Sequence, residues 1–275
     1  MLFGCSSNES TTPQVEDDSS LRIVSLAPSL TELAFQAGAG DRLVATVEYS
    51  DYPPAALELP RIGDAFRIDF EQLRALNPDL ILVWESGNPA DMQARLVELG
   101  YTILVLEPKR LEDVADHLRI IGEHAGTSDI ADAAAFDYLS QLDEIWQRYG
   151  AAPDTSVFFQ ISAAPWFTVN GDHVISQILS RCGGQNVFSD LPVIAGSVAL
   201  ESILAANPEV IVAPISGPDD IEWRGQWAKF DSIVAVQENA FINVGRDQIS
   251  RSSMRLAEAA SQICSELSRI RNSSN

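Results

Sequence analysis

The chain has 275 residues, the length of one large or two small domains, and its 46% hydrophobic and 21% charged residues are typical of a globular protein. This composition excludes a fibrous or wholly disordered chain. With 18 Lys and Arg against 39 Asp and Glu, the formal net charge is −21, which repels phosphate backbones and argues against nucleic-acid binding.

Residues 1–20 form a polar segment, rich in Ser, Thr and acidic side chains, that we expect to be a flexible tether. Within it, Leu2-Phe3-Gly4-Cys5 resembles the motif in which bacterial lipoproteins carry their lipidated cysteine. We therefore expect Cys5 to anchor an exported protein at the outer face of a membrane. The alternative is a free thiol, because only four residues precede Cys5, whereas a signal peptide needs an apolar stretch of about 7–15 residues.

From residue 21 onward, short apolar runs alternate with segments of helical periodicity. The alternation predicts a mostly parallel sheet that is covered by helices on both faces. A capping box formed by Ser29 and Glu32 predicts the start of the first helix, which ends near Gly38. The other predicted elements of this half are strands at 22–26, 43–47, 80–84 and 102–106 and helices at 69–76, 90–99 and 111–124.

A repeat with an offset of 130 residues (201 − 71) relates residues 71–87 to residues 201–217. Both copies predict a short helix, an Asn-Pro stop, a buried strand and a Ser-Gly loop. Seven identities in 17 positions without a gap indicate a duplication, so we expect two similar lobes with a sheet each. The identical pairs are Glu71 and Glu201, Ala75 and Ala205, Asn77 and Asn207, Pro78 and Pro208, Ile81 and Ile211, Ser86 and Ser216, and Gly87 and Gly217.

Between the two lobes, residues 127–149 predict one helix that is roughly 34 Å long at about 1.5 Å per residue. Such a helix ties an N-terminal lobe at 21–126 stiffly to a C-terminal lobe at 150–275 and predicts limited closure. The expected fold class is α/β. Its architecture is two Rossmann-like lobes with mostly parallel sheets, joined by one long rigid helix, with a ligand cleft between the lobes.

Aromatic side chains gather where predicted strands end, and ligands of open α/β sheets bind at the carboxyl ends of the strands. Any one of these rings could instead belong to the core. Their presence at strand ends of both lobes favours the walls of a cleft. The residues are Tyr49, Tyr52, Trp84, Trp166 and Phe167.

The sequence contains none of the common nucleotide-binding or hydrolase motifs, which argues against an enzyme. Asp51 and Glu85 could form a carboxylate pair, but we interpret Asp51 as a loop cap and Glu85 as solvent-exposed. We expect His117 and His124 on the polar face of a helix and His173 at the start of another, which is no metal-binding pattern. A scaffold without a ligand is the third possibility, and the aromatic residues at the strand ends argue against it.

The two cysteines beyond Cys5 are Cys182 and Cys264, whose spacing fits no zinc motif. Two buried thiols fit the sequence. If the protein is exported, a disulfide between them is the alternative.

Over residues 21–270 the sequence resembles the substrate-binding proteins of bacterial ABC importers in which a rigid helix joins two lobes, and within them the cobalamin-binding branch. The same family also carries haem and ferric siderophores. The resemblance implies a monomer in the periplasm that captures a corrinoid and delivers it to a dimeric membrane permease, with a haem or ferric-siderophore carrier as the alternative. The stretches that carry it are 49–53, 76–84, 87–88, 167–168 with Gly171, 182–184 with Asn186, and Arg251 with Cys264.

The resemblance also implies ligand contacts in this chain. Tyr49, Trp84 and Phe167 match aromatic residues that contact the corrin, and Asp247 and Arg251 match polar residues on the rim of the opposite lobe. We count Trp166 among the expected contacts from its place at a strand end. These walls suit cobalamin, a large and nearly neutral molecule with amide arms.

Further matches concern docking and the disulfide. Glu71 and Glu201 match the acids, one on each lobe, that dock on the permease, although an acid in a first helical turn also complements the helix dipole. Cys182 and Cys264 match the family's disulfide. Two cleft tryptophans of the family are Ala65 and Ala195 here, and we expect the neighbouring Phe66 to replace the first.

Overall fold

The computed structural model describes residues 21–215 and 220–273. The segment 1–20, with the expected tether and the expected lipid on Cys5, lies outside the described residues, as do Ser216 and Gly217 of the repeat. In the described part of the chain, no helix combines the length and the apolar character that a bilayer crossing requires.

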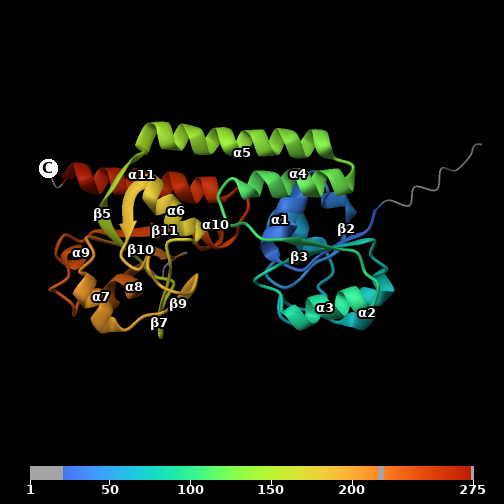
Figure 1. Cartoon of the computed structure of the whole chain (residues 1–275), viewed down its shortest axis with the longest axis horizontal. Helices are drawn as coiled ribbons and strands as arrows, with labels where there is room; N and C mark the ends of the chain where they lie inside the picture. The colour runs from blue at the N-terminus through green and yellow to red at the C-terminus, as the bar shows by residue number, and fades with distance from the viewer. Residues whose placement is uncertain (1–20, 216–219, 274–275) are drawn as a thin grey trace, which may run out of the picture.

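The N-terminal lobe is a four-stranded sheet with helices on both sides (Figure 1). Its strands are parallel and lie in the order β2-β1-β3-β4. Leu80–Trp84 (β3) is a continuous apolar run, as expected for a strand that is covered on both faces. The elements are β1 (Ile23–Ser25), α1 (Pro28–Gln36), η1 (Gly40–Arg42), β2 (Leu43–Ala45), η2 (Pro54–Glu58), α2 (Phe70–Leu76), β3, α3 (Ala90–Glu98), β4 (Ile103–Leu106) and α4 (Asp113–Ala125).

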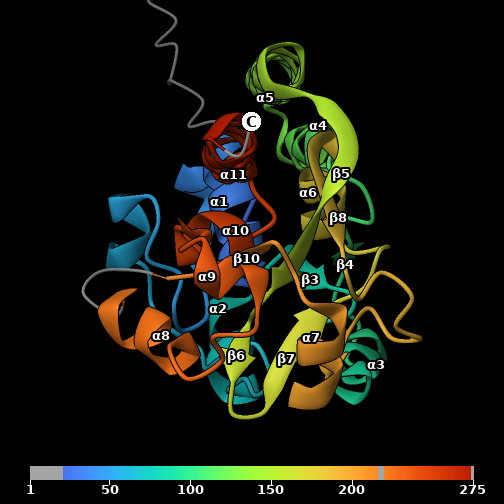
Figure 2. The ribbon, with the colours of Figure 1, turned by 90° about the vertical axis from the view of Figure 1, so that its left-hand side faces the viewer.

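The C-terminal lobe has a second parallel sheet, in the order β11-β10-β5-β8, and a small antiparallel sheet, β6-β7-β9. Seen from this lobe, β6 and β7 lie at the end of the molecule opposite α5 (Figure 2). The elements are β5 (Ala151–Phe159), β6 (Ser162–Ala163), β7 (Trp166–Val169), α6 (Val174–Arg181), β8 (Cys182–Asn186), β9 (Ala195–Ser197), α7 (Leu200–Ala206), β10 (Val210–Pro214), α8 (Asp220–Trp227), α9 (Val234–Gln237), β11 (Phe241–Val244), α10 (Arg246–Ser250) and α11 (Leu256–Ser273).

The predicted duplication is visible in the elements. Helices α2 and α7 have seven residues each, and both end at an asparagine in the left-handed conformation, with φ of 45° at Asn77 and 44° at Asn207. Asparagine tolerates this conformation better than most residues and stops the helix before the proline that follows. A buried strand comes next in each copy. The expected fold class of two parallel α/β lobes is therefore confirmed.

The predicted capping box at the start of α1 is wrong. The N-cap is Ala27, and Pro28 occupies the first helical turn, where a missing N–H costs nothing. Ser29 therefore lies inside the helix, and Glu32 does not reach back to cap it but is fully buried. Its partners lie in the other lobe, as described below.

One long helix, α5 (Ser128–Tyr149), runs along both lobes beside α4 and α11 (Figure 1). A single hydrophobic cluster continues from the N-terminal sheet through α5 into the C-terminal lobe. Tyr138 is fully buried within it and donates a hydrogen bond of 3.1 Å to the carbonyl of Leu111. Because the lobes share this core, the helix is packed along its length rather than being a free linker.

Cys182 and Cys264 form a disulfide between the start of β8 and helix α11. Both residues are fully buried. The bond ties the last helix of the chain to the C-terminal sheet, as the family resemblance implies.

Removing this disulfide is expected to destabilise the protein strongly. The bond closes a loop of 82 residues, and the loss of unfolded-state entropy predicts that Cys182→Ala with Cys264→Ala lowers the free energy of unfolding by about 3–5 kcal/mol. Denaturant titration of the oxidised protein and of the double variant measures the difference. Alkylation of both cysteines in the unreduced, exported protein, detected by mass spectrometry, would show that the bond does not form.

Candidate ligand-binding cleft

A cavity of about 1010 Å³ lies between the two lobes. The loop after β4 and the end of β3 form one wall, and β5, α6, β10 and α10 contribute the other. The wall is largely apolar, which suits a large organic ligand. Its main apolar side chains are Trp84, Pro108, Phe159, Ile161, Ile194 and Ile249.

A second cavity, of about 280 Å³, adjoins the first. The two share Trp84, Pro108, Ser250 and Ser252, so they are neighbouring parts of one cleft. The smaller cavity is more polar because Asp247 and Arg251 line it, together with serine hydroxyls.

Trp84 is the aromatic residue that both cavities share. It ends β3, is half-buried, and also packs against the main hydrophobic cluster. The turn after it is held by Asn88, whose side chain accepts a hydrogen bond from the Trp84 amide (2.7 Å) and donates to the carbonyls of Leu26 (2.9 Å) and Ala65 (2.8 Å). Gly87 lies against the indole so closely that a Cβ there would overlap the ring. The local sequence therefore fixes this ring at the cleft.

The other expected aromatic residues lie in different surroundings. Tyr49 lines the smaller cavity with 78% of its surface exposed, and Phe66 is 71% exposed. Trp166 packs in the C-terminal core, with its ring centroid 4.7 Å from that of Trp227. Phe167 follows it in β7 and so faces the other side of that strand. Among the described residues, Phe66, Trp166 and Phe167 border neither cavity, and their roles as ligand contacts stay predictions.

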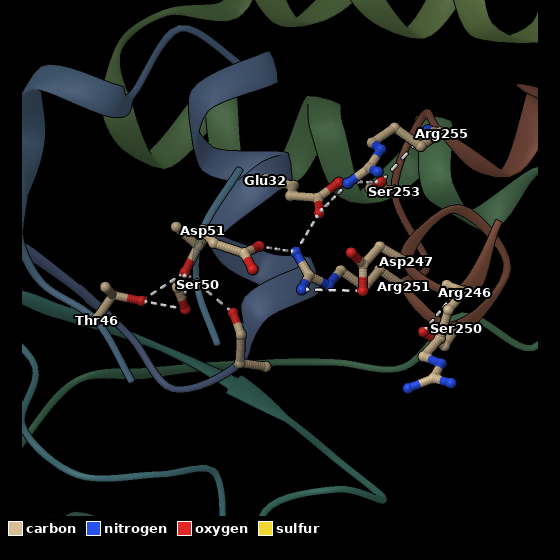
Figure 3. A network of polar contacts seen from close by, with 12 residues as sticks. Glu32, Thr46, Ser50, Asp51, Arg246, Asp247, Ser250, Arg251, Ser253 and Arg255 are labelled. Atoms are coloured by element: carbon tan, nitrogen blue, oxygen red, sulfur yellow. Dashed lines mark hydrogen bonds and ion pairs between the residues drawn. The ribbon is translucent and has the colours of Figure 1, made fainter. Parts of the chain in front are cut away.

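An ionic network crosses between the lobes at the smaller cavity (Figure 3). Nη1 of Arg251 lies 3.0 Å from Oε1 of Glu32 and 2.6 Å from Oδ1 of Asp51, both in the N-terminal lobe. Nη2 of Arg251 lies 3.3 Å from Oδ1 of Asp247, one helical turn earlier in the chain. Oε1 of Glu32 also lies 3.1 Å from Nη1 of Arg255, and Oε2 accepts a hydrogen bond of 2.6 Å from the Ser253 hydroxyl. The two lobes are therefore joined at the cleft through paired charges.

The interpretation of Asp51 as a loop cap is wrong, because its carboxylate pairs with Arg251 from the other lobe. The hydrogen bond from Arg251 keeps the pKa of Asp51 below its usual value. Buried hydroxyl groups hold the chain just before Asp51. The Thr46 hydroxyl lies 2.6 Å from the Thr31 hydroxyl and donates a hydrogen bond of 2.7 Å to the Ser50 hydroxyl. The prediction that Glu85 is exposed is confirmed.

The expectation that His117 lies on a polar helix face is wrong, because only 7% of its surface is exposed. It lines the smaller cavity, whereas His124 near the end of the helix is exposed as expected. His173 caps α6, and its Nδ1 accepts a hydrogen bond of 3.2 Å from the amide of Ile175. Burial lowers the pKa of His173 to about 4, so its ring is neutral at pH 7 and carries its proton on Nε2.

The sequence reasoning missed Glu32 and Arg255 as residues of the ionic network between the lobes. A signal for Glu32 exists, since it is the one acid within the apolar run of residues 30–35. Its partner Arg251 lies 219 residues away, and no local pattern connects the two.

Comparison with known proteins places the chain in a family. The family model described as periplasmic binding protein matches residues 23–248. The chain belongs to this family. The vitamin B12-binding protein of Vibrio cholerae is 36% identical over 247 residues, which cover 90% of this chain and 88% of that protein. The vitamin B12-binding protein of Photorhabdus laumondii is 34% identical over 248 residues, again 90% of this chain and 88% of that protein.

Solved structures of periplasmic binding proteins have the same fold. The crystal structure of the periplasmic vitamin B12-binding protein of Vibrio cholerae matches with a TM-score of 0.85 and 35% identity, over 91% of this chain and 97% of that one. A periplasmic haem-binding protein from Roseiflexus matches with a TM-score of 0.78 and 20% identity, over 91% of this chain and 99% of that one. The second match is a likeness of fold alone.

Proposed function

We propose that this periplasmic binding protein captures cobalamin between its lobes and delivers it to the permease of an ABC importer without catalysing a reaction. The observation that carries the proposal is the inter-lobe cavity of about 1010 Å³, with a largely apolar wall, in a chain that is 36% identical to a vitamin B12-binding protein. A wall of this kind binds by apolar contact and shape. In the proposal, the lobes are residues 21–126 and 150–275, and Cys5 carries a lipid that holds the protein at the membrane.

The proposed contacts come from both lobes. Trp84 lies against the flat face of the corrin, Tyr49 and Phe66 contact its edge from the N-terminal lobe, and Phe167 contacts it from the C-terminal lobe. Asp247 and Arg251 meet its polar arms. The position of Trp84 in both cavities supports the first of these assignments.

Calorimetric titration of the ligand-free protein with cyanocobalamin, cobinamide, haemin and a ferric siderophore tests the proposal. We expect cyanocobalamin and cobinamide to bind and the other two to bind much more weakly. Tight binding of haemin or the siderophore without binding of either corrinoid would establish the alternative carrier function and reject this one.

Docking on the permease is expected to depend on Glu71 and Glu201. Each lies in the first turn of its helix, α2 or α7, and both are exposed at equivalent places of the two lobes. Since neither borders the cleft, Glu71→Ala with Glu201→Ala should leave cobalamin affinity unchanged and reduce stimulation of the transporter's ATPase about tenfold or more, as expected for lost interfacial charge pairs.

A matched control removes the same charge elsewhere. Glu123→Ala with Glu258→Ala changes one exposed glutamate in each lobe, on α4 and α11, which lie on the side of the molecule opposite α2 and α7 (Figure 1), and should leave the stimulation intact. Equal loss of stimulation in both double variants would mean that net charge matters and that Glu71 and Glu201 are not docking residues.

A further inference from the structure

The charged residues of the cleft wall are mostly acidic. Among the described lining residues, the basic side chains are Lys109 and Arg251. Acidic lining residues outnumber them, and Asp51 and Glu32 stand directly behind Arg251. The chain as a whole carries a charge of −21, so no long-range field compensates. The acidic lining residues are Glu85, Glu107, Asp172 and Asp247.

The positive charge of Arg251 is already cancelled within the protein (Figure 3). Glu32 and Asp51 engage the two protons of Nη1, at 3.0 Å and 2.6 Å, and Asp247 lies 3.3 Å from Nη2. Arg255 shares Glu32 with Arg251, which makes the cluster two arginines against three carboxylates. The cluster as a whole is therefore net negative, and Asp247 and Arg251 are its members that line the smaller cavity.

Arg251 nevertheless keeps hydrogen-bonding capacity. A guanidinium has five N–H donors. The contacts above leave the Nε proton and one proton of Nη2 without a partner among the described residues. A ligand that enters the smaller cavity thus meets N–H donors beside a charge cluster that has one carboxylate more than it has arginines. A neutral amide carbonyl can accept these hydrogen bonds, whereas a ligand carboxylate would be repelled by Asp247, which lines the cavity, and by Asp51, which lies behind Arg251.

We propose that Asp51, together with Glu32 and Asp247, makes the cleft selective for amide arms over carboxylate arms, so that Asp51 is a specificity-determining residue. The inference rests on the proposed cobalamin function and extends it, since it states why the site rejects anionic tetrapyrroles and acid derivatives of the corrinoid. Asp51 contributes by repelling the negative charge of a ligand carboxylate, which weakens binding of the acid and leaves binding of the amide unaffected.

The test compares cyanocobalamin with its monocarboxylic acids, in which one propionamide is hydrolysed to a carboxylate. The measured quantity is the dissociation constant of the monocarboxylic acid divided by that of cyanocobalamin, from calorimetric titrations at pH 7. At an effective dielectric constant of about 20–40 and a charge separation of about 8 Å, the acid whose altered arm enters the smaller cavity should bind about 5- to 30-fold more weakly. The ratio should decrease toward one as salt is added, because salt screens half-exposed charges.

Asp51→Asn keeps an oxygen that accepts the hydrogen bond from Arg251 and removes the charge, so it should lower the ratio several-fold, toward one. Asp247→Asn is a second, independent variant with the same expected direction. Asp137→Asn removes one charge from the exposed face of α5, which borders neither cavity, and should leave the ratio unchanged.

The outcomes separate the two proposals. If the wild-type protein binds cyanocobalamin and every monoacid equally well, or if Asp51→Asn and Asp247→Asn leave the ratio as it is, the selectivity mechanism is wrong while the cobalamin function stands. If the folded wild-type protein binds no corrinoid at all, the proposed function and this inference fail together.

Discussion

Replacing Glu32 with alanine is expected to destabilise the protein by about 3–5 kcal/mol, because it leaves buried charge without its partner. The Glu32 side chain is fully buried, and Arg251 and Arg255 are only 10% and 12% exposed. Without the carboxylate, Arg255 loses its ion pair, Arg251 keeps only Asp51 and Asp247, and the Ser253 hydroxyl loses its acceptor. Chemical denaturation followed by fluorescence measures the change in the free energy of unfolding.

Two further variants define the origin of the effect. Glu123→Ala makes the same substitution at an exposed position of α4 and should change the free energy of unfolding by less than about 0.5 kcal/mol. Glu32→Gln keeps an acceptor for Ser253 but not the charge, so its effect should lie between those of the two alanine variants. A change of less than about 1 kcal/mol for Glu32→Ala would contradict the view that the network stabilises the contact between the lobes.

The network also marks the limit of sequence-based reasoning for this fold. Apolar runs were enough to predict β3, and the repeated Asn-Pro stop was enough to predict that α7 and β10 copy α2 and β3. These signals are local, because a strand or a helix end is determined by neighbouring residues. The pairing of Glu32 with Arg251 depends instead on how two lobes dock, and it joins residues that are 219 positions apart.

Local patterns also failed where several signals compete. Ser29 and Glu32 have the spacing of a capping box, but the N-cap is Ala27, so the helix starts two residues earlier, at Pro28. The antiparallel sheet β6-β7-β9 was not predicted, since its strands have only two to four residues and show no clear periodicity. Trp166 and Phe167 are adjacent rings at a strand end, and the sequence alone does not tell which one faces the core.

Replacing Trp84 with alanine is expected to weaken cobalamin binding by roughly 10- to 150-fold. The indole lines both cavities, and burying an aromatic side chain against a ligand contributes on the order of 1.5–3 kcal/mol. Gly87→Ala tests the same ring without removing it, because the added methyl group would overlap the indole and force it to move. Both variants should therefore lose affinity in titrations with cyanocobalamin.

Thermal melting, recorded beside each titration, separates a ligand contact from a core residue. Trp84 packs partly against the main hydrophobic cluster, so Trp84→Ala should also lower the melting temperature. Trp146 is a half-buried tryptophan of α5 that packs against the same cluster but borders neither cavity. Trp146→Ala should therefore lower the melting temperature and leave the affinity unchanged. If Trp84→Ala behaves in the same way as Trp146→Ala, Trp84 is a core residue and the ligand does not lie against it.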